Sequence, residues 1–250
     1  MIYPQKGRTQ QGDEIMRDDQ SGTEQNAETV RREIAAFALE IGAVRLSPEE
    51  PFTWASGYRM PIYNDNRLLM RYPRGRALVR AGFLAHAGLG AADSIQAVAG
   101  TASAGIAPAA VLAEALGIDF YYVRSSVKGH GLARKIEGLS REEALLEKPL
   151  AGRSVLLVED LISTGGSALA AAEALQEAGA NLVGCGAIFS YGFDEAPRAF
   201  SRLAPPCPLW TIFDLEFLLG VAAEDGGLSQ EDMETIRRWR EDPFGWGEGR

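Results

Sequence analysis

Apolar and polar residues along the chain form blocks that predict strands followed by helices. The apolar run Val155 to Val158 is typical of a strand buried on both faces, and the Ala-, Leu- and Glu-rich stretch Ala168 to Ala178 predicts a helix. Further strands are expected at 95–99, 120–123 and 182–189, and further helices at 27–41, 74–87, 106–116, 214–222 and from Glu231 onward, after a Ser229 cap. This rhythm predicts an α/β fold in which helices flank a mainly parallel twisted sheet.

Two segments break the rhythm. Residues 1–25 are polar and without apolar periodicity, which predicts a mobile N-terminal tail ahead of a single domain over 26–250. Residues 52–67 are aromatic and rich in turn formers, so short strands and loops are expected there instead of a helix.

Composition excludes several classes of protein. The 250 residues are 46% hydrophobic and 24% charged, as in a globular domain, and no apolar run approaches the roughly 18 residues that span a membrane. The N-terminus lacks the apolar core of a signal peptide, so a cytoplasmic protein without a membrane partner is expected. The net charge of −9 argues against general nucleic-acid binding. Cys185 and Cys207 show neither ligand spacing nor a disulfide framework and are interpreted as structural or incidental.

The strongest candidate site is the segment that follows the buried strand. Glu159 and Asp160 stand at its end, and Ser163-Thr164-Gly165-Gly166-Ser167 opens the next helix. The N–H groups at a helix N-terminus bind phosphate, and the hydroxyls add donors. Carboxylates one sugar length away suit vicinal ribose hydroxyls. The alternative is an ordinary turn with a solvated Glu-Asp pair, but so many requirements met in order favour a site for a phosphorylated sugar.

Two other loops are expected at the same edge of the sheet. Gly100 to Gly105 is glycine-rich and enters a helix, either to bind a second phosphate or as a common packing device. The chain from Tyr121 to Ile136 has no acidic residue and holds the cations Arg124 and Lys128 beside His130. An isolated basic run is usually a solvated loop, but open α/β sheets bind ligands at the carboxyl ends of their strands. One ligand with a 5′-phosphate, a ribose and a 1-diphosphate would use all three loops.

These motifs resemble those of a known family. The Glu-Asp turn resembles the phosphoribosyl pyrophosphate (PRPP) motif of the type I phosphoribosyltransferases. Together with Phe52 to Gly57, Pro61 to Arg67, the Lys-x-His-Gly of 128–131 and Ile136-Glu137-Gly138, it resembles the orotate phosphoribosyltransferases over roughly residues 27–223. The resemblance implies a small N-terminal base-binding subregion and a magnesium-dependent transfer of phosphoribose from PRPP to orotate, giving orotidine 5′-monophosphate and diphosphate in pyrimidine biosynthesis. It also implies a homodimer in which loop 124–138 closes over the diphosphate in the partner's site.

The expected roles follow from chemistry in which diphosphate leaves an anomeric carbon. The protein must position the reactants and stabilise the leaving group, and Mg²⁺ supplies part of the charge. Lys128, His130 and Asp160 are the candidate catalytic residues. The candidate substrate-binding residues are Arg124, Glu159, Asp160, Ser163, Thr164, Gly165, Gly166, Ser167, Tyr63 and Arg67. No protein metal ligand is assigned. His86 is interpreted as structural, whereas Trp54, Tyr58 and Tyr63 either stack on a pyrimidine or fill the N-terminal core.

Several positions depart from the family pattern. Ala55, Ala104, Ser125 and Gly129 stand where charged residues are frequent, and Ser190 to Asp194 lacks the arginine that often binds the orotate carboxylate. Arg59, Arg67 and Arg198 are the possible substitutes. Two alternatives therefore stay open: a phosphoribosyltransferase for another base, and a regulator that keeps the PRPP fold and senses nucleotides or binds RNA.

Overall fold

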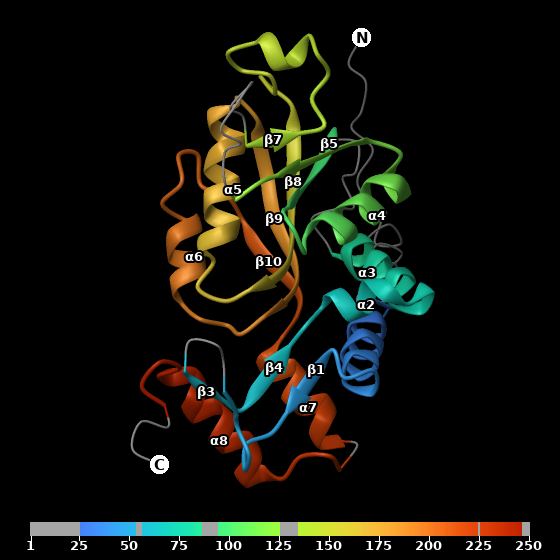
Figure 1. The fold of residues 1–250 in the computed structure, drawn as a ribbon. Coiled ribbons are helices and arrows are strands. Elements are labelled where there is room, and N and C mark those ends of the chain that lie inside the picture. The colour runs from blue at the N-terminus through green and yellow to red at the C-terminus, as the bar shows by residue number, and fades with distance from the viewer. Residues whose placement is uncertain (1–25, 54–56, 87–94, 126–134, 225, 247–250) are drawn as a thin grey trace, which may run out of the picture.

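The computed structural model describes residues 26–53, 57–86, 95–125, 135–224 and 226–246. Its centre is a six-stranded sheet of order β10-β9-β8-β5-β6-β7 (Figure 1). The strands are β5 (Ala97–Thr101), β6 (Asp119–Val123), β7 (Ile136–Glu137), β8 (Ser154–Ile162), β9 (Asn181–Ser190) and β10 (Leu209–Asp214). All neighbours run parallel except β7, which is antiparallel to β6, so the predicted mainly parallel α/β fold is confirmed.

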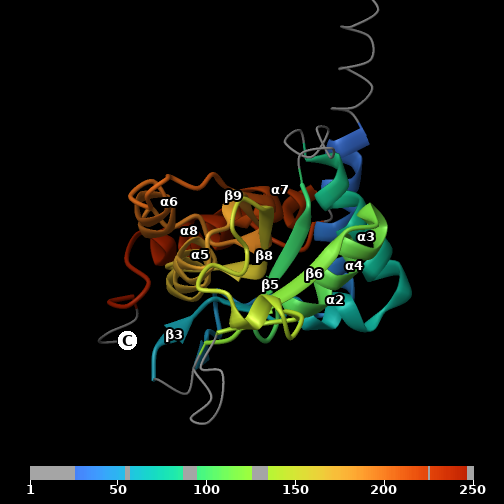
Figure 2. The same cartoon turned by 90° about the horizontal axis from the view of Figure 1, so that it is seen from above.

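Helices cover both faces of this sheet, α5 and α6 on one side and α3 and α4 on the other (Figures 1 and 2). They are α3 (Pro73–Ala85), α4 (Ile106–Leu116), α5 (Gly166–Glu177) and α6 (Glu195–Phe200). The buried apolar side chains accordingly form two clusters, one on each face. β8 lies between them with Val155 to Val158 fully or almost fully buried, as the unbroken apolar run predicts.

A smaller subregion lies at one end of the sheet, in the lower part of Figure 1. It contains residues 26–40, which are helical, and two short antiparallel pairs, β1 with β4 and β2 with β3. These strands are β1 (Val44–Leu46), β2 (Phe52–Thr53), β3 (Arg59–Met60) and β4 (Ile62–Asn64). The C-terminal helices α7 (Leu215–Glu224) and α8 (Gln230–Glu241) pack against it, and α2 (Arg67–Arg71) follows β4. The expectation of short strands over 52–67 is therefore confirmed.

The element boundaries differ from the sequence predictions in instructive ways. The strand predicted to end at Val158 continues to Ile162, so Glu159 and Asp160 lie inside β8 and not beyond it. The reason is that β9 keeps pairing with β8 as far as Ile162 and Ser190, which local pattern does not reveal. The next helix begins at Gly166, before the predicted Ala168. Strand β10 and helix α6 were not predicted, whereas α8 begins at Gln230, directly after the predicted Ser229 cap, which forms a capping box with Asp232.

Residues 1–25, predicted to be a mobile tail, lie outside the described residues. No described helix is both long and apolar enough to span a membrane.

Candidate active site

The turn after β8 has the geometry of an anion-binding helix N-terminus. Gly165 occupies the N-cap of α5 with φ of 83°, the left-handed region that favours glycine, and no side chain caps the helix. A Cβ on Gly165 would lie 2.7 Å from that of Ala196, so α6 packs directly beneath the turn. Thr164, Gly166 and Ser167 are exposed. The first N–H groups of α5 therefore face solvent without a side-chain partner and are available to a phosphate.

The two carboxylates that precede this turn occupy different environments. Glu159 is only 6% exposed, and burial followed by the charge of Asp160 raises its pKa to about 8. Its Oε1 accepts a hydrogen bond from the Asp160 N–H at 3.0 Å. Asp160 is half-buried, and burial raises the pKa of its carboxyl while its contact with Glu159 and the charge of Arg67 oppose the rise. Asp160 is thus the more accessible of the pair, and Glu159 also supports the backbone of Asp160.

The three predicted loops meet at one cleft. A cavity of about 240 Å³ at the carboxyl edge of the sheet is bounded by residues from all of them. The lining residues include Thr101 and Ala102 after β5, Arg124 and Ser125 after β6, Lys135, and Gly166 and Ser167 of α5. Parallel strands place their carboxyl ends side by side, which is why loops far apart in sequence converge here. The cleft combines cations with helix N–H groups, a suitable set for a phosphate-bearing ligand.

The basic loop is anchored where its ends are described. Arg124 Nη1 lies 2.9 Å from Glu137 Oε1 across the β6–β7 pair, and the Arg124 N–H donates to the Lys135 carbonyl at 2.8 Å. The sequence analysis did not predict this ion pair, because it found no acidic residue within 121–136. Glu137 lies one residue beyond that range and faces Arg124 only when β6 and β7 pair. Lys128 and His130 lie outside the described residues.

Tyr63 belongs to an aromatic cluster of the N-terminal subregion. Its ring centroid lies 5.9 Å from that of Phe52, and the guanidinium of Arg45 lies 4.7 Å above the Tyr63 ring. Tyr58 is 40% exposed and packs edge-on against Phe244 at 5.3 Å. Both tyrosines therefore pack against neighbouring side chains of the subregion and remain partly exposed, whereas Trp54 falls outside the described residues.

Arg67 lies close enough to Asp160 to act on it electrostatically. Its guanidinium pairs with Asp65, with Nε 2.6 Å from Oδ1, and the side chain remains 67% exposed. The hydrogen bond from Arg67 holds the pKa of the Asp65 carboxyl below its usual range. The charge of Arg67 also opposes the rise that burial causes in the pKa of Asp160.

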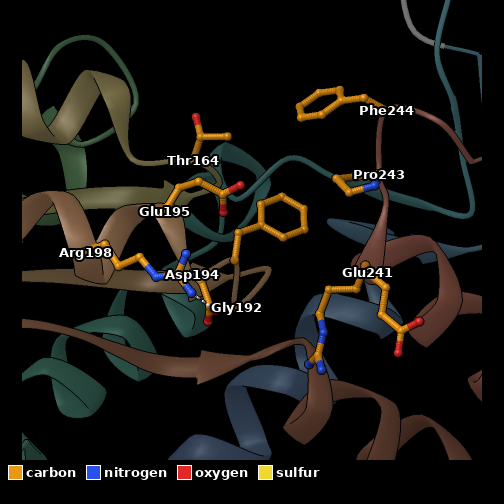
Figure 3. A pocket seen from close by; sticks show the side chains of 10 residues that line it. Thr164, Gly192, Asp194, Glu195, Arg198, Glu241, Pro243 and Phe244 are labelled. Carbon is orange, nitrogen blue, oxygen red and sulfur yellow. Dashed lines mark hydrogen bonds and ion pairs between the residues drawn. The ribbon is translucent and has the colours of Figure 1, made fainter.

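A second cleft is lined by Thr164 of the same turn (Figure 3). Its volume is about 340 Å³, and it lies between Thr164, the segment after β9 and the end of α8. Arg198 pairs with Asp194 at 2.8 Å within this cleft. Arg240 shares Glu216 with Arg237, so these three side chains carry a net positive charge. Phe193 and Phe244 add two aromatic rings to the lining, and Glu195 and Glu241 add two further carboxylates.

Sequence reasoning missed three residues near the site. Tyr191 is 1% exposed, and burial, then the charges of Asp160 and Tyr63, raise the pKa of its hydroxyl. Asn66 is fully buried and donates to the Asp160 carbonyl. Arg240 reaches the second cleft from α8. Asn66 and Tyr191 lie within the segments 61–67 and 190–194 that the sequence analysis singled out, but neither residue was assigned a role there, whereas no local signal marks Arg240.

Two minor assignments can be compared with the structure. His86 follows α3 instead of lying on its face, and it stacks on Trp210 with ring centroids 3.7 Å apart, as a structural histidine would. Cys185 and Cys207 are buried and free.

Comparison with known proteins agrees with this architecture. Residues 81–201 match the phosphoribosyl transferase domain family model. The chain is 44% identical over 218 residues to the orotate phosphoribosyltransferase of Bacillus caldolyticus, a match that covers 87% of this chain and 100% of the relative.

Solved structures show the same likeness. The Aeropyrum pernix orotate phosphoribosyltransferase superposes with a TM-score of 0.62 at 25% identity, covering 78% of this chain and 99% of that one. The Mycobacterium tuberculosis H37Rv enzyme, solved with 5-phospho-α-D-ribosyl 1-diphosphate, has a TM-score of 0.57 at 26% identity and coverages of 76% and 98%. The fold and the turn after β8 thus define a phosphoribosyltransferase. Within that class, the chain belongs to the orotate phosphoribosyltransferase family.

Proposed function

We propose that this enzyme transfers the phosphoribosyl group from PRPP to orotate at the edge of the sheet where the three loops meet. The observation that carries the proposal is the convergence of Thr101, Arg124 and Ser167, one residue from each of the three loops, on one cleft. The N-terminus of α5 would bind the 5′-phosphate, and Asp160 with Glu159 would hold the ribose hydroxyls. The Gly100 to Gly105 loop and Arg124 would then face the diphosphate, where negative charge develops as it leaves.

Magnesium fits this arrangement as a companion of the substrate. Among the described residues, no group of three or more acidic, histidine or cysteine side chains could hold a metal ion. Mg²⁺ usually binds one or two carboxylates together with substrate phosphates and water, and the Glu159–Asp160 pair offers such oxygens. Bound there, the ion would neutralise part of the diphosphate charge. The chain's own contribution is to orient the ribose and to supply cations, with Lys128 and His130 of loop 124–138 acting in the partner's site of a homodimer.

The carboxylate of orotate requires a cation, and we assign the second cleft to the orotate base. That cleft adjoins the phosphate turn at Thr164 and offers aromatic surface at Phe193 and Phe244 (Figure 3). Arg198 is paired one-to-one with Asp194, and Arg67 with Asp65. Arg240 shares its carboxylate with a second arginine and so retains more net positive charge for an anionic base. Arg240 is therefore the proposed carboxylate partner, and Tyr63 and Arg67 border the ribose side.

A base panel tests the activity directly. The purified protein with PRPP and Mg²⁺ is expected to convert orotate to its mononucleotide and to leave adenine, hypoxanthine and uracil nearly untouched. Chromatography separates the nucleotide products. Faster formation of a purine nucleotide would show that the substrate is another base and not orotate. PRPP binding without turnover of any base would indicate a regulator. The cytoplasmic location expected from the sequence stays a prediction.

A further inference from the structure

The backbone of Asp160 lies beyond the point where β8 stops pairing with its neighbour β5. Strand β5 pairs with β8 only as far as Gly100 and Val158, whereas β9 continues with Glu159 opposite Ala187 and Leu161 opposite Phe189. Neighbouring residues of a parallel strand direct their N–H and C=O groups alternately to the two sides. Residue 160 therefore falls beyond the last β5 partner, on the side that β5 no longer reaches.

Two side chains replace the missing strand. Glu159 Oε1 accepts from the Asp160 N–H at 3.0 Å, and Asn66 Nδ2 donates to the Asp160 carbonyl at 2.7 Å. Both polar groups of this peptide backbone are thereby satisfied, one by a neighbour in the strand and one from 94 residues away. A buried carbonyl left without a donor is unfavourable, so the Asn66 contact restricts the orientation of residue 160.

Asn66 is placed for this contact rather than for the helix it precedes. It occupies the N-cap of α2, a position where asparagine commonly accepts from the helix N–H groups, yet it makes no side-chain cap bond. It is fully buried, and its Oδ1 has no hydrogen-bond partner. The Asn66 side chain thus neither caps α2 nor uses its Oδ1, but its Nδ2 donates a hydrogen bond to the Asp160 carbonyl.

We propose that Asn66 is a positioning residue that fixes the direction of the Asp160 carboxylate, an inference that rests on the ribose-binding role proposed for Asp160. Because Asn66 lies two residues after β4, the strand that carries Tyr63, the bond also couples the proposed base-binding subregion to the proposed sugar site. Asn66 itself contacts no substrate in this scheme. Its effect on catalysis passes through Asp160.

The test compares Asn66→Ala with Leu69→Ala. Leu69 is a fully buried residue of α2 whose apolar side chain cannot hydrogen-bond to Asp160, so its variant reports destabilisation of α2 without loss of that bond. Asn66→Ala is expected to lower kcat/KM for PRPP by about 10–100-fold at a temperature where both variants are folded, the usual range for losing an orienting hydrogen bond to a functional ligand. Leu69→Ala should lower Tm and leave the kinetic constants near wild type.

A double-mutant cycle separates positioning from packing. In an Asp160→Asn background, Asn66→Ala should cost less than threefold further in kcat/KM, although its effect on Tm persists. PRPP affinity measured by calorimetry should show the same pattern without any base present, so failure of the orotate assignment would not be confused with failure of this inference.

Several results would overturn the proposal. The first is full additivity of the losses in kcat/KM caused by Asn66→Ala and Asp160→Asn. The others are an unchanged PRPP affinity in a folded Asn66→Ala protein and a loss of kcat/KM in Leu69→Ala equal to that in Asn66→Ala. If Asn66→Ala does not fold, Asn66→Asp replaces it, since it keeps the shape and removes the donor. Failure of both to fold would assign Asn66 a structural role instead.

Discussion

Trp239, close to the end of the chain, donates its indole N–H to the sulfur of Met60, with Nε1 and Sδ 3.2 Å apart. The indole is fully buried and packs edge-on against Tyr191, with ring centroids 5.4 Å apart. One side chain of α8 therefore contacts both strand β3 and the segment that follows β9. The C-terminal helix is therefore fixed to the core beside the second cleft, which Arg240 and Glu241 of α8 help to line.

Removing this indole should destabilise the fold. Trp239→Ala is expected to lower the free energy of unfolding by about 3–5 kcal/mol, through lost apolar burial and the cavity left behind. Arg238→Ala on the same helix is the control, because Arg238 is exposed and its hydrogen bond to Thr235 lies at the surface, so a change within about 0.5 kcal/mol is expected. Urea unfolding measures both. Equal small effects would show that α8 is not integrated into the core.

Asp160 is predicted to contribute through its charge. Asp160→Asn keeps the shape but removes an ionised acceptor worth about 1.5–3 kcal/mol, which corresponds to a loss of roughly 10–150-fold in kcat/KM. Tm should remain close to wild type. Steady-state kinetics with varied PRPP measure the loss, and an unchanged value would remove Asp160 from the ribose site.

Glu159 should make stability depend on pH. Its pKa is raised from 4.5 to about 8, so between these values the folded chain holds a proton that the unfolded chain releases. Stability from this group is therefore complete below pH 4.5 and is lost as pH rises toward 8, by at most about 1.4 kcal/mol per pH unit. Without PRPP and Mg²⁺, the stability of wild type relative to Glu159→Gln should fall between pH 5.5 and 8.5. Parallel stability curves from urea unfolding would contradict the raised pKa.

The base side can be tested with two arginines that share one carboxylate. Arg240→Gln should raise KM for orotate by about 10–100-fold, since a charge-assisted hydrogen bond contributes about 1.5–3 kcal/mol, while KM for PRPP stays within twofold. Arg237→Gln is the matched control, because Arg237 also pairs with Glu216 but does not line the second cleft. Equal effects of the two substitutions on orotate would point to Glu216 and the packing of α8 instead.

The basic loop and the dimer are tested together. Lys128→Ala should reduce turnover by about 10²–10³-fold, the scale for losing one preorganised charge stabiliser. If Lys128 acts in the partner's site, Lys128→Ala and Asp160→Ala chains refolded together should recover about a quarter of wild-type activity, since about half of the dimers are mixed and each has one intact site. With mixed dimers verified by different tags, recovery near zero would place Lys128 in its own subunit's site or outside catalysis.

Local patterns were sufficient for much of this protein. The unbroken apolar run predicted the central strand β8, and the glycines and hydroxyls after Ile162 predicted a turn that opens a helix. Both features depend on residues close together in sequence, where burial periodicity and backbone conformation are read directly. The order of strands and helices likewise predicted the parallel sheet, because consecutive elements in such folds are neighbours.

Only the tertiary structure decided how distant residues meet. The length of β8 beyond Val158 depends on pairing with β9, the partner of Arg124 depends on a hairpin with β7, and the donor to Asp160 comes from Asn66, 94 residues away. Arg240 reaches the second cleft from α8, which Trp239 packs onto the N-terminal subregion through Met60. Each of these contacts arises from burial and hydrogen bonding between elements far apart in the chain, which no local periodicity encodes.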